Sequence, residues 1–141
     1  MRRWLTASAL LVFLTVPAWA QDIVGTWYGE GYQTPIGLYL QYLDFFKADG
    51  SVHSEFRQFT DCKLTFSSFQ DGTWEIKDGK LTIAVYSVDD KPVDPAGHTD
   101  VYAIDSITDT EFAYTHLASG DHYDSYRQED GFKFPPCGPT S

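Results

Sequence analysis

Eight short segments of β-type sequence follow one another in this chain, and the connections between them alternate between short and long. Aromatic, β-branched and alternating apolar residues fill the segments, and Gly, Pro and Asp residues separate them. The segments cover residues 24–32, 38–47, 52–59, 73–77, 81–88, 101–107, 111–117 and 122–128. No segment shows sustained helical periodicity, so we predict an all-β fold.

Connections after even-numbered segments are short, and connections after odd-numbered segments are longer. Two or three residues follow the second, fourth and sixth segments, at 48–50, 78–79 and 108–110. Longer stretches follow the first, third, fifth and seventh, at 33–37, 60–72, 89–100 and 118–121. Alternate connections of an up-and-down meander lie at the same end. We therefore expect an eight-stranded antiparallel barrel with one closed end and one open mouth.

The second segment is apolar on both faces of the expected strand. Leu40 and Tyr42 share one face, and Leu43 and Phe45 share the other. Such a strand must be covered on both sides, either by the Pro-rich C-terminal tail or by a partner chain. The tail contains Pro135, Pro136 and Pro139, and it cannot continue a sheet.

The first residues resemble an export signal. Arg2 and Arg3 precede a short apolar run at 10–14, and a small-residue cleavage site ends at Ala20. The run is far shorter than the roughly twenty residues of a membrane-spanning helix. We predict a secretory signal at 1–20, one domain at 21–141, and a periplasmic or secreted protein.

Two cysteines, Cys62 and Cys137, lie in the expected exported domain. An even count in an oxidising compartment indicates one disulfide. Catalytic or metal-binding thiols are the alternative, but no Cys-x-x-Cys spacing supports them.

Acidic residues outnumber basic ones, and the formal net charge is −10. A surface of this charge repels nucleic-acid phosphates and anionic lipid headgroups, so nucleic acid is a poor partner. The outward positions of the expected strands include Glu55, Arg57, Glu75 and Lys77. Charged side chains do not suit a lipid-facing surface, so we predict no membrane insertion.

The first segment begins with Gly25-Thr26-Trp27, and Arg127 lies in the last segment, where antiparallel closure would bring it near Trp27. This arrangement resembles the lipocalins, in the wider calycin group, and above all their small bacterial exported relatives. The resemblance implies that Arg127 packs over Trp27 and that a disulfide ties the C-terminal segment to the barrel, as Cys62 and Cys137 could do. Lipocalins usually carry a helix after the last strand, which the Pro-rich tail is too short to form.

Barrels of eight strands are either filled by their own side chains or hold one small ligand. Aromatic residues make up 16% of the chain and could do either. We predict binding of a small apolar or aromatic molecule in the cup, and the alternative is a protein-binding module that acts through the loops at 34–36 and 89–99. The candidate ligand-binding residues near the mouth are Leu40, Tyr42, Phe56, Val85, Tyr102, Tyr114 and His116.

No set of residues indicates catalysis. The sequence lacks a Gly-x-Ser-x-Gly motif and a phosphate-binding glycine loop. A transition metal could be held by residues near the mouth, but their spacing fits no known motif. These residues are His98, His116, His122, Asp121 and Asp124. The loop with Asp89, Asp90 and Asp94 lacks the ordered spacing of a calcium site. We predict a protein without a cofactor, a metal or an enzymatic activity.

Overall fold

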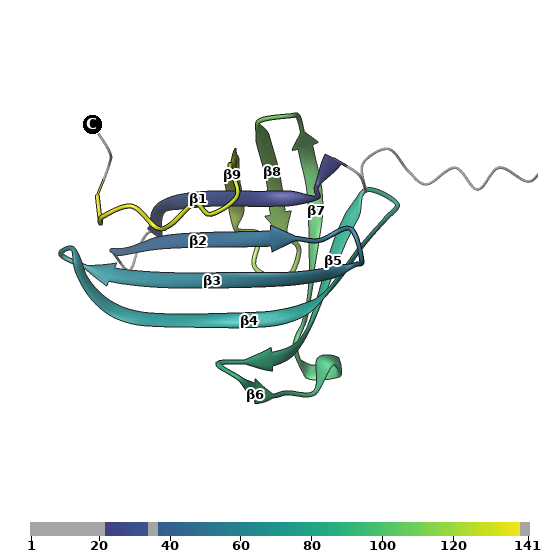
Figure 1. The fold of residues 1–141 in the computed structure, drawn as a ribbon, viewed down its shortest axis with the longest axis horizontal. Helices are drawn as coiled ribbons and strands as arrows, with labels where there is room; N and C mark the ends of the chain where they lie inside the picture. Colours follow the sequence, from purple (N-terminus) through teal and green to yellow (C-terminus); the bar gives the residue numbers. More distant parts are fainter. Residues whose placement is uncertain (1–21, 34–36, 139–141) are drawn as a thin grey trace, which may run out of the picture.

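The computed structural model describes residues 22–33 and 37–138 of this chain, and β-strands make up most of them (Figure 1). The elements are β1 (Gly25–Gln33), β2 (Leu38–Phe46), β3 (Ser51–Thr60), β4 (Lys63–Lys77), β5 (Lys80–Val88), β6 (Lys91–Pro92), η1 (Pro95–Gly97), β7 (Thr99–Ile107), β8 (Glu111–His116) and β9 (His122–Gln128). Eight of the strands are the eight segments expected from the sequence, and β6 is an addition of two residues.

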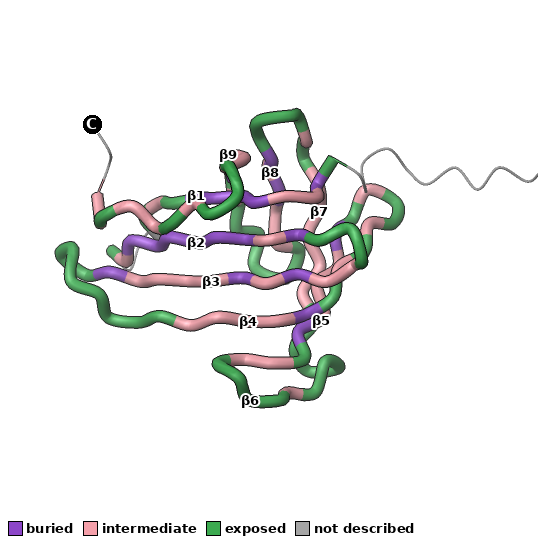
Figure 2. Tube along the Cα trace, viewed as in Figure 1, coloured by how far each residue is buried: buried purple, intermediate pink, exposed green. Residues whose placement is uncertain are grey.

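These eight strands close into an antiparallel barrel, which confirms the predicted fold class. Neighbouring strands pair in chain order, β5 pairs with β7, and β9 returns to pair with β1. In Figure 1, β1 to β4 form one layer of nearly aligned strands, and β5, β7, β8 and β9 cross behind it at a large angle. The buried residues are concentrated on β2 and the neighbouring parts of β1 and β3, and others lie on β5 and β8 (Figure 2).

The predicted signal at 1–20 lies outside the described residues. Among the residues that the structure does describe, no helix is long and apolar enough to cross a membrane.

The three short connections are confirmed at one end of the barrel. At the other end, the long connection predicted for 60–72 is wrong, because β3 and β4 are joined by a two-residue turn at Asp61 and Cys62. Both turn residues have positive φ, of 48° and 55°, as a tight hairpin requires. The segment that follows is therefore strand, and β4 begins ten residues earlier than expected.

The connection predicted for 89–100 contains structure of its own. Asp89 and Asp90 form a second tight turn with positive φ, and β6 pairs back onto the end of β5. The short helix η1 follows, and Asp94 caps it by accepting a hydrogen bond from the Ala96 amide. This unit projects from the end of β5 (Figure 1).

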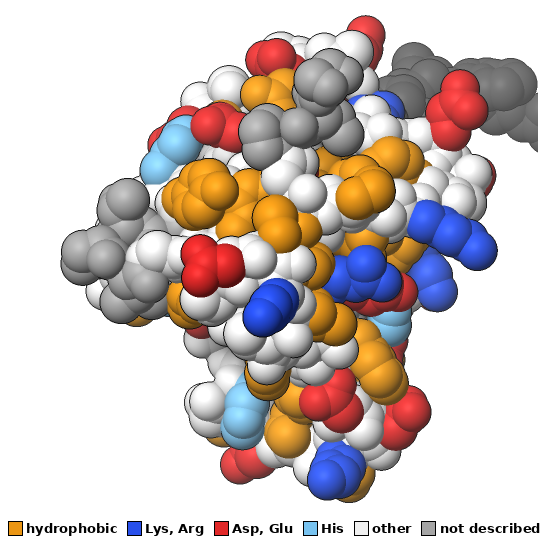
Figure 3. All heavy atoms as spheres, turned by 90° about the vertical axis from the view of Figure 1, so that its left-hand side faces the viewer, with side chains coloured by type: hydrophobic (Ala, Val, Ile, Leu, Met, Phe, Trp, Pro, Cys, Tyr) orange, Lys and Arg blue, Asp and Glu red, His pale blue; other side chains and the backbone are white. Residues whose placement is uncertain are grey.

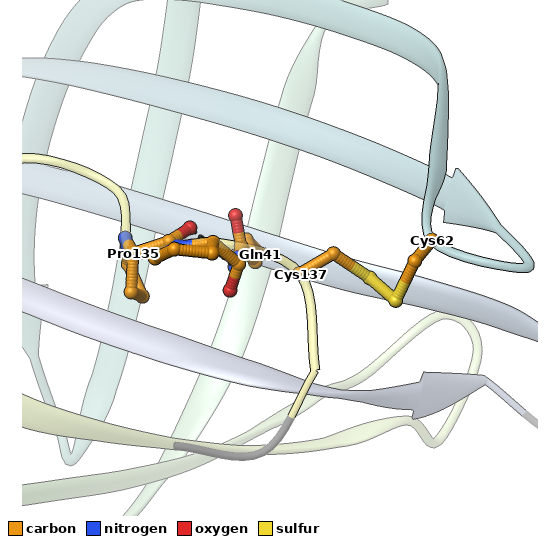
Figure 4. The surroundings of a disulfide bond; sticks show 5 residues. Gln41, Cys62, Pro135 and Cys137 are labelled. Carbon is orange, nitrogen blue, oxygen red and sulfur yellow. Dashed lines mark hydrogen bonds between the residues drawn. A yellow bond between two sulfur atoms is a disulfide. The ribbon is translucent and has the colours of Figure 1, made fainter.

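The C-terminal tail covers the outer face of the barrel, which explains why β2 is apolar on both sides. Gln41 points outward from β2 and donates a hydrogen bond to the carbonyl of Pro135, at 3.1 Å. A disulfide joins Cys137 to Cys62 at the tip of the β3–β4 hairpin (Figure 4), as predicted. Phe134 packs against Arg57 of β3, and Phe132 packs against Tyr28 of β1. Up to residue 138, where the described part of the chain ends, the tail contains no helix, as expected from its prolines.

Candidate functional site

An open cavity of about 100 Å³ lies inside the barrel. Seven of the eight barrel strands contribute to its walls, because side chains at alternate positions of each strand point inward. The lining residues are Leu40, Tyr42, Asp44, Phe46, Ser54, Phe56, Gln70, Leu81, Ile83, Asp100, Tyr102, Tyr114 and Tyr123. The interior is therefore partly filled and partly open.

Aromatic side chains close the barrel below the cavity. Phe46 packs edge-on against Phe112, and Phe112 packs edge-on against Trp27. The indole nitrogen of Trp27 donates a hydrogen bond to the carbonyl of Ile23, at 2.7 Å. All of these side chains are buried, so the closed end has a dry, packed floor.

Arg127 covers this floor from outside. Its guanidinium carbon lies 4.3 Å from the centroid of the Trp27 ring, within the range of a cation–π interaction. The same guanidinium donates to the carbonyls of Asp22, Val24 and Asp109. Gly25 is required beneath it, because a Cβ there would lie 2.5 Å from the guanidinium and the backbone φ is +138°.

Four tyrosines form one wall of the cavity. Tyr102, Tyr114, Tyr123 and Tyr42 come from β7, β8, β9 and β2, and each ring contacts the next. Their centroids are 5.3 Å, 5.4 Å and 5.7 Å apart in that order. Burial raises the pKa of every member of this wall, so the hydroxyls remain protonated.

Polar side chains face this tyrosine wall from the β2–β4 side. Asp44 lies opposite Ser54 in the β2–β3 register, and Ser54 lies opposite Gln70 in the β3–β4 register. The three side chains therefore form a polar row across the cavity. Ser54 donates a hydrogen bond of 2.5 Å to an Asp44 carboxylate oxygen.

The Asp44 carboxylate is held in an unfavourable environment for a charge. Only 8% of the residue is exposed. Burial raises the pKa of Asp44 to about 6, although the Ser54 hydrogen bond and the nearby His53 offset part of this effect. At neutral pH the cavity thus contains a desolvated negative charge.

The lipocalin-like domain family matches the sequence over residues 23–114. This range covers more than half of the chain, and it includes the Trp27 floor and the strands from β1 to β7, with most of β8. The chain belongs to the lipocalin-like domain family. A search of curated proteins found no match.

A second opening of the lipocalin-like barrel lies at the seam between β1 and β9. These strands pair only from Thr26 to Tyr28, and above that point they diverge around a crevice of about 140 Å³. Tyr42 lines both the crevice and the main cavity, and its hydroxyl donates to the Asp124 carbonyl at 2.7 Å. Gly29 leaves room for the Tyr42 ring, since a Cβ there would lie 2.0 Å from it.

The structure brings five of the seven predicted ligand-binding residues into the wall of this lipocalin-like cavity. They are Leu40, Tyr42, Phe56, Tyr102 and Tyr114. Val85 and His116 are not among the residues that line it. Val85 lies next to the β4–β5 bulge, and its amide donates to the His98 carbonyl. His116 bonds Asp100 at 2.9 Å and Ser119 at 2.8 Å, so it holds the β8–β9 turn at the rim.

Of the other histidines, His122 and His53 each contact two carboxylates, and His98 bonds the backbone carbonyl of Asp94 at 3.0 Å. His122 lies 3.2 Å from Asp105 and 3.2 Å from Asp124. His53, on the outer face of β3, bonds Asp71 at 2.7 Å. Within residues 22–33 and 37–138, no group of three or more potential ligands has a geometry that could hold a metal ion.

The sequence analysis did not predict the polar row or Tyr123 of the tyrosine wall. Asp44 continues the inward alternation that starts with Leu40 and Tyr42 and ends with Phe46. This period-2 pattern is visible in the sequence and would have placed the carboxylate inside. Gln70 carried no such signal, because its segment was expected to be a loop.

Proposed function

We propose that this exported lipocalin-like barrel binds a small apolar or aromatic molecule in its cup and does not act as an enzyme. The observation that carries the proposal is the open cavity between the tyrosine wall and the polar row. Pockets for small molecules are concave and mostly apolar, with a few polar groups that orient the ligand. Barrels of this family are in general binding modules, which agrees with this reading.

The volume of the cavity limits the size of the ligand. Drug-sized molecules occupy pockets of roughly 300–1,000 Å³, whereas this cavity measures about 100 Å³. A ligand enclosed within it has the size of a single substituted ring. A longer molecule would extend through the mouth or into the seam crevice beside Tyr42.

Titration with neutral aromatic probes tests this function. Toluene is followed by calorimetry, and N-phenyl-1-naphthylamine is followed by quenching of tryptophan fluorescence. We expect saturable binding of at least one probe. Ile83→Phe fills the cavity and should abolish that binding, while Thr82→Phe adds the same ring at the neighbouring position, outside the lining. If no probe binds saturably to the unaltered protein, the cup is not the binding site. The same conclusion follows if Ile83→Phe and Thr82→Phe bind the probe equally well.

A second candidate is a protein-binding module that acts through loops at the open end. The observation that favours it is the projecting unit of β6 and η1, whose residues are mostly exposed. The other predicted contact loop, 34–36, lies outside the described residues. Capture of a partner that is lost when residues 89–98 are replaced by a short Gly-Ser turn would support this candidate, and unchanged capture would oppose it.

Export to the periplasm or the medium is part of the proposal. The Cys62–Cys137 disulfide supports it, because disulfides persist in oxidising compartments. Sequencing the N-terminus of the protein recovered from these compartments should show cleavage before Gln21. Recovery of the uncleaved chain from the cytoplasm alone would contradict this prediction.

A further inference from the structure

The buried carboxylate of the polar row has an incomplete set of partners. One oxygen of Asp44 accepts the Ser54 hydrogen bond, and in the described part of the chain no hydrogen bond reaches the other. Each oxygen of an ionised carboxylate can accept two hydrogen bonds. The Asp44 carboxylate can therefore accept further hydrogen bonds from a molecule in the cavity that it lines.

No positive side chain of the described residues faces Asp44 across the cavity. The lining contains no Lys, Arg or His, and its second carboxylate, Asp100, already bonds His116 at the rim. His53 lies on the opposite face of β3 and pairs with Asp71 and Glu55. A buried charge without a counter-ion is costly, so the cavity favours a ligand that carries a positive charge.

The tyrosine wall also favours a positively charged ligand. Aromatic faces attract cations within about 6 Å of the ring centroid, and the tyrosine wall presents four rings to the cavity. Asp44 also contributes to the raised pKa of Tyr102 and Tyr114, which shows that its negative potential extends across to this wall. A cation between the two sides would interact favourably with both.

We propose that the ligand of the cup is a small organic cation, a protonated amine on an apolar or aromatic body, with Asp44 as its counter-ion and the tyrosine wall around it. This inference rests on the proposed function, because it names the ligand class of the same cavity. An anionic ligand would place like charges together, and a neutral one would leave the buried carboxylate unpaired.

Three probes of one shape but different charge test the inference. Benzylamine carries the cation, benzyl alcohol is its neutral counterpart, and benzoate is the anion. We measure each by calorimetry at about pH 8, where an alkyl amine and Asp44 are both ionised. Benzylamine should bind roughly tenfold or more tightly than benzyl alcohol, as expected for a charge-assisted hydrogen bond. Benzoate should show no saturable binding.

Two isosteric variants assign the preference to one carboxylate. Asp44→Asn should lower the affinity for benzylamine to about that for benzyl alcohol and leave benzyl alcohol within roughly threefold. Asp105→Asn removes an exposed carboxylate of β7 that does not line the cavity, and it should retain the preference for benzylamine. Thermal melts of both variants verify that the barrel is intact.

The outcomes separate this inference from the function on which it rests. Equal affinities for benzylamine and benzyl alcohol in the unaltered protein, with loss of both in Ile83→Phe, would overturn the cation inference and keep the binding cup. A preference that survives in Asp44→Asn would also overturn it. If none of these probes, nor toluene, binds saturably, both proposals fail. The comparison of probes on the unaltered chain needs no variant, so it remains decisive even if Asp44→Asn does not fold.

Discussion

Arg127 joins three separate parts of the chain at the closed end of the barrel. It stacks on Trp27 and donates to carbonyls of the segment before β1 and of the β7–β8 turn. A lysine would keep the charge but could not reproduce the planar fork of donors. We expect Arg127→Lys to lower the free energy of unfolding by about 1–3 kcal/mol, measured by urea denaturation.

Arg57 offers a matched control for this prediction. Its guanidinium also stacks on a ring, that of Phe134 at 4.4 Å. Within the described residues, however, the Arg57 side chain makes no hydrogen bond. Arg57→Lys should therefore change the free energy of unfolding by less than about 1 kcal/mol. Equal effects of the two substitutions would show that the carbonyl contacts of Arg127 contribute little.

Asp44 should make the stability of the barrel depend on pH. Its pKa is raised from 3.8 to about 6 in the folded state, so between these values the folded protein binds more protons than the unfolded one. Stability therefore falls as pH rises through this window, by about 2–3 kcal/mol from this group. Asp44→Asn removes the effect, and the variant should gain stability relative to the unaltered protein at pH 7 but not at pH 4.

The difference between the two proteins is the quantity to measure, because the other titrating groups cancel in it. Urea denaturation at both pH values gives this difference. A value that stays constant from pH 4 to pH 7 would mean that the Asp44 carboxyl is hydrated in the folded state.

At the scale of single residues, the sequence predicted apolar positions better than polar ones. Leu40, Tyr42 and Phe56 were expected in the interior because alternation places apolar side chains there. His116 was expected to line the cup, but its bonds to Asp100 and Ser119 hold it at the rim. Such short-range polar contacts depend on turn geometry, which sequence spacing does not specify.

At the scale of elements, the tail is held to the outer face of β1–β3 chiefly by the disulfide. The bridge closes a chain separation of 75 residues, and such a loop corresponds to roughly 4–5 kcal/mol in the chain-entropy model. We expect the double substitution Cys62→Ser and Cys137→Ser to lower the free energy of unfolding by about 2–5 kcal/mol and to release the tail.

Proteolysis measures the release of the tail. Lys133 is exposed within the tail, so trypsin should cleave there faster in the variant. Equal cleavage rates with and without the bridge would show that Phe132, Phe134 and Gln41 hold the tail unaided.

A β-bulge interrupts the pairing of β4 with β5, and its extra residue, Tyr86, lies on β5. The register shifts between Asp71 and Gly72, and a Cβ on Gly72 would lie 2.5 Å from the Ala84 carbonyl oxygen. Because backbone cannot move aside cheaply, Gly72→Ala should lower the free energy of unfolding by roughly 2 kcal/mol. Gly31→Ala is the matched control, since a Cβ on Gly31 meets nothing within 4 Å. Both are measured by chemical denaturation, and equal losses would contradict the steric explanation.

The sequence predicted which strands exist but not how far they extend. Each of the three short turns contains Asp, and two of them also contain Gly. The β3–β4 turn instead places Cys62 at positive φ without a glycine. The first part of β4 was consequently assigned to a loop, and Gln70 was lost from the expected cavity.

At the scale of the whole molecule, closure is strongest at the floor and weakest at the mouth. β1 pairs with β2 along its whole length from Gly25 to Gln33, but it pairs with β9 only from Thr26 to Tyr28. The Tyr42 hydroxyl bridges the open part of this seam by its bond to Asp124. We therefore expect the barrel to open locally at the seam while its floor stays closed, which would give a small ligand a path to the cavity.

Hydrogen exchange can test this order of opening. Amides of residues 122–124 should exchange faster than those of β2 and β3, because few buried contacts oppose local opening at the seam. Tyr42→Phe removes the bridge to Asp124, and loss of one hydrogen bond of about 1 kcal/mol should speed exchange at the seam roughly fivefold. Tyr32→Phe removes an exposed hydroxyl and should leave the rate unchanged.

Benzylamine, bound against Tyr42 and Tyr123, should slow exchange at the seam more than at the floor. Uniform protection by the ligand, or no effect of Tyr42→Phe, would instead indicate that the barrel opens as one unit and that access lies through the mouth alone.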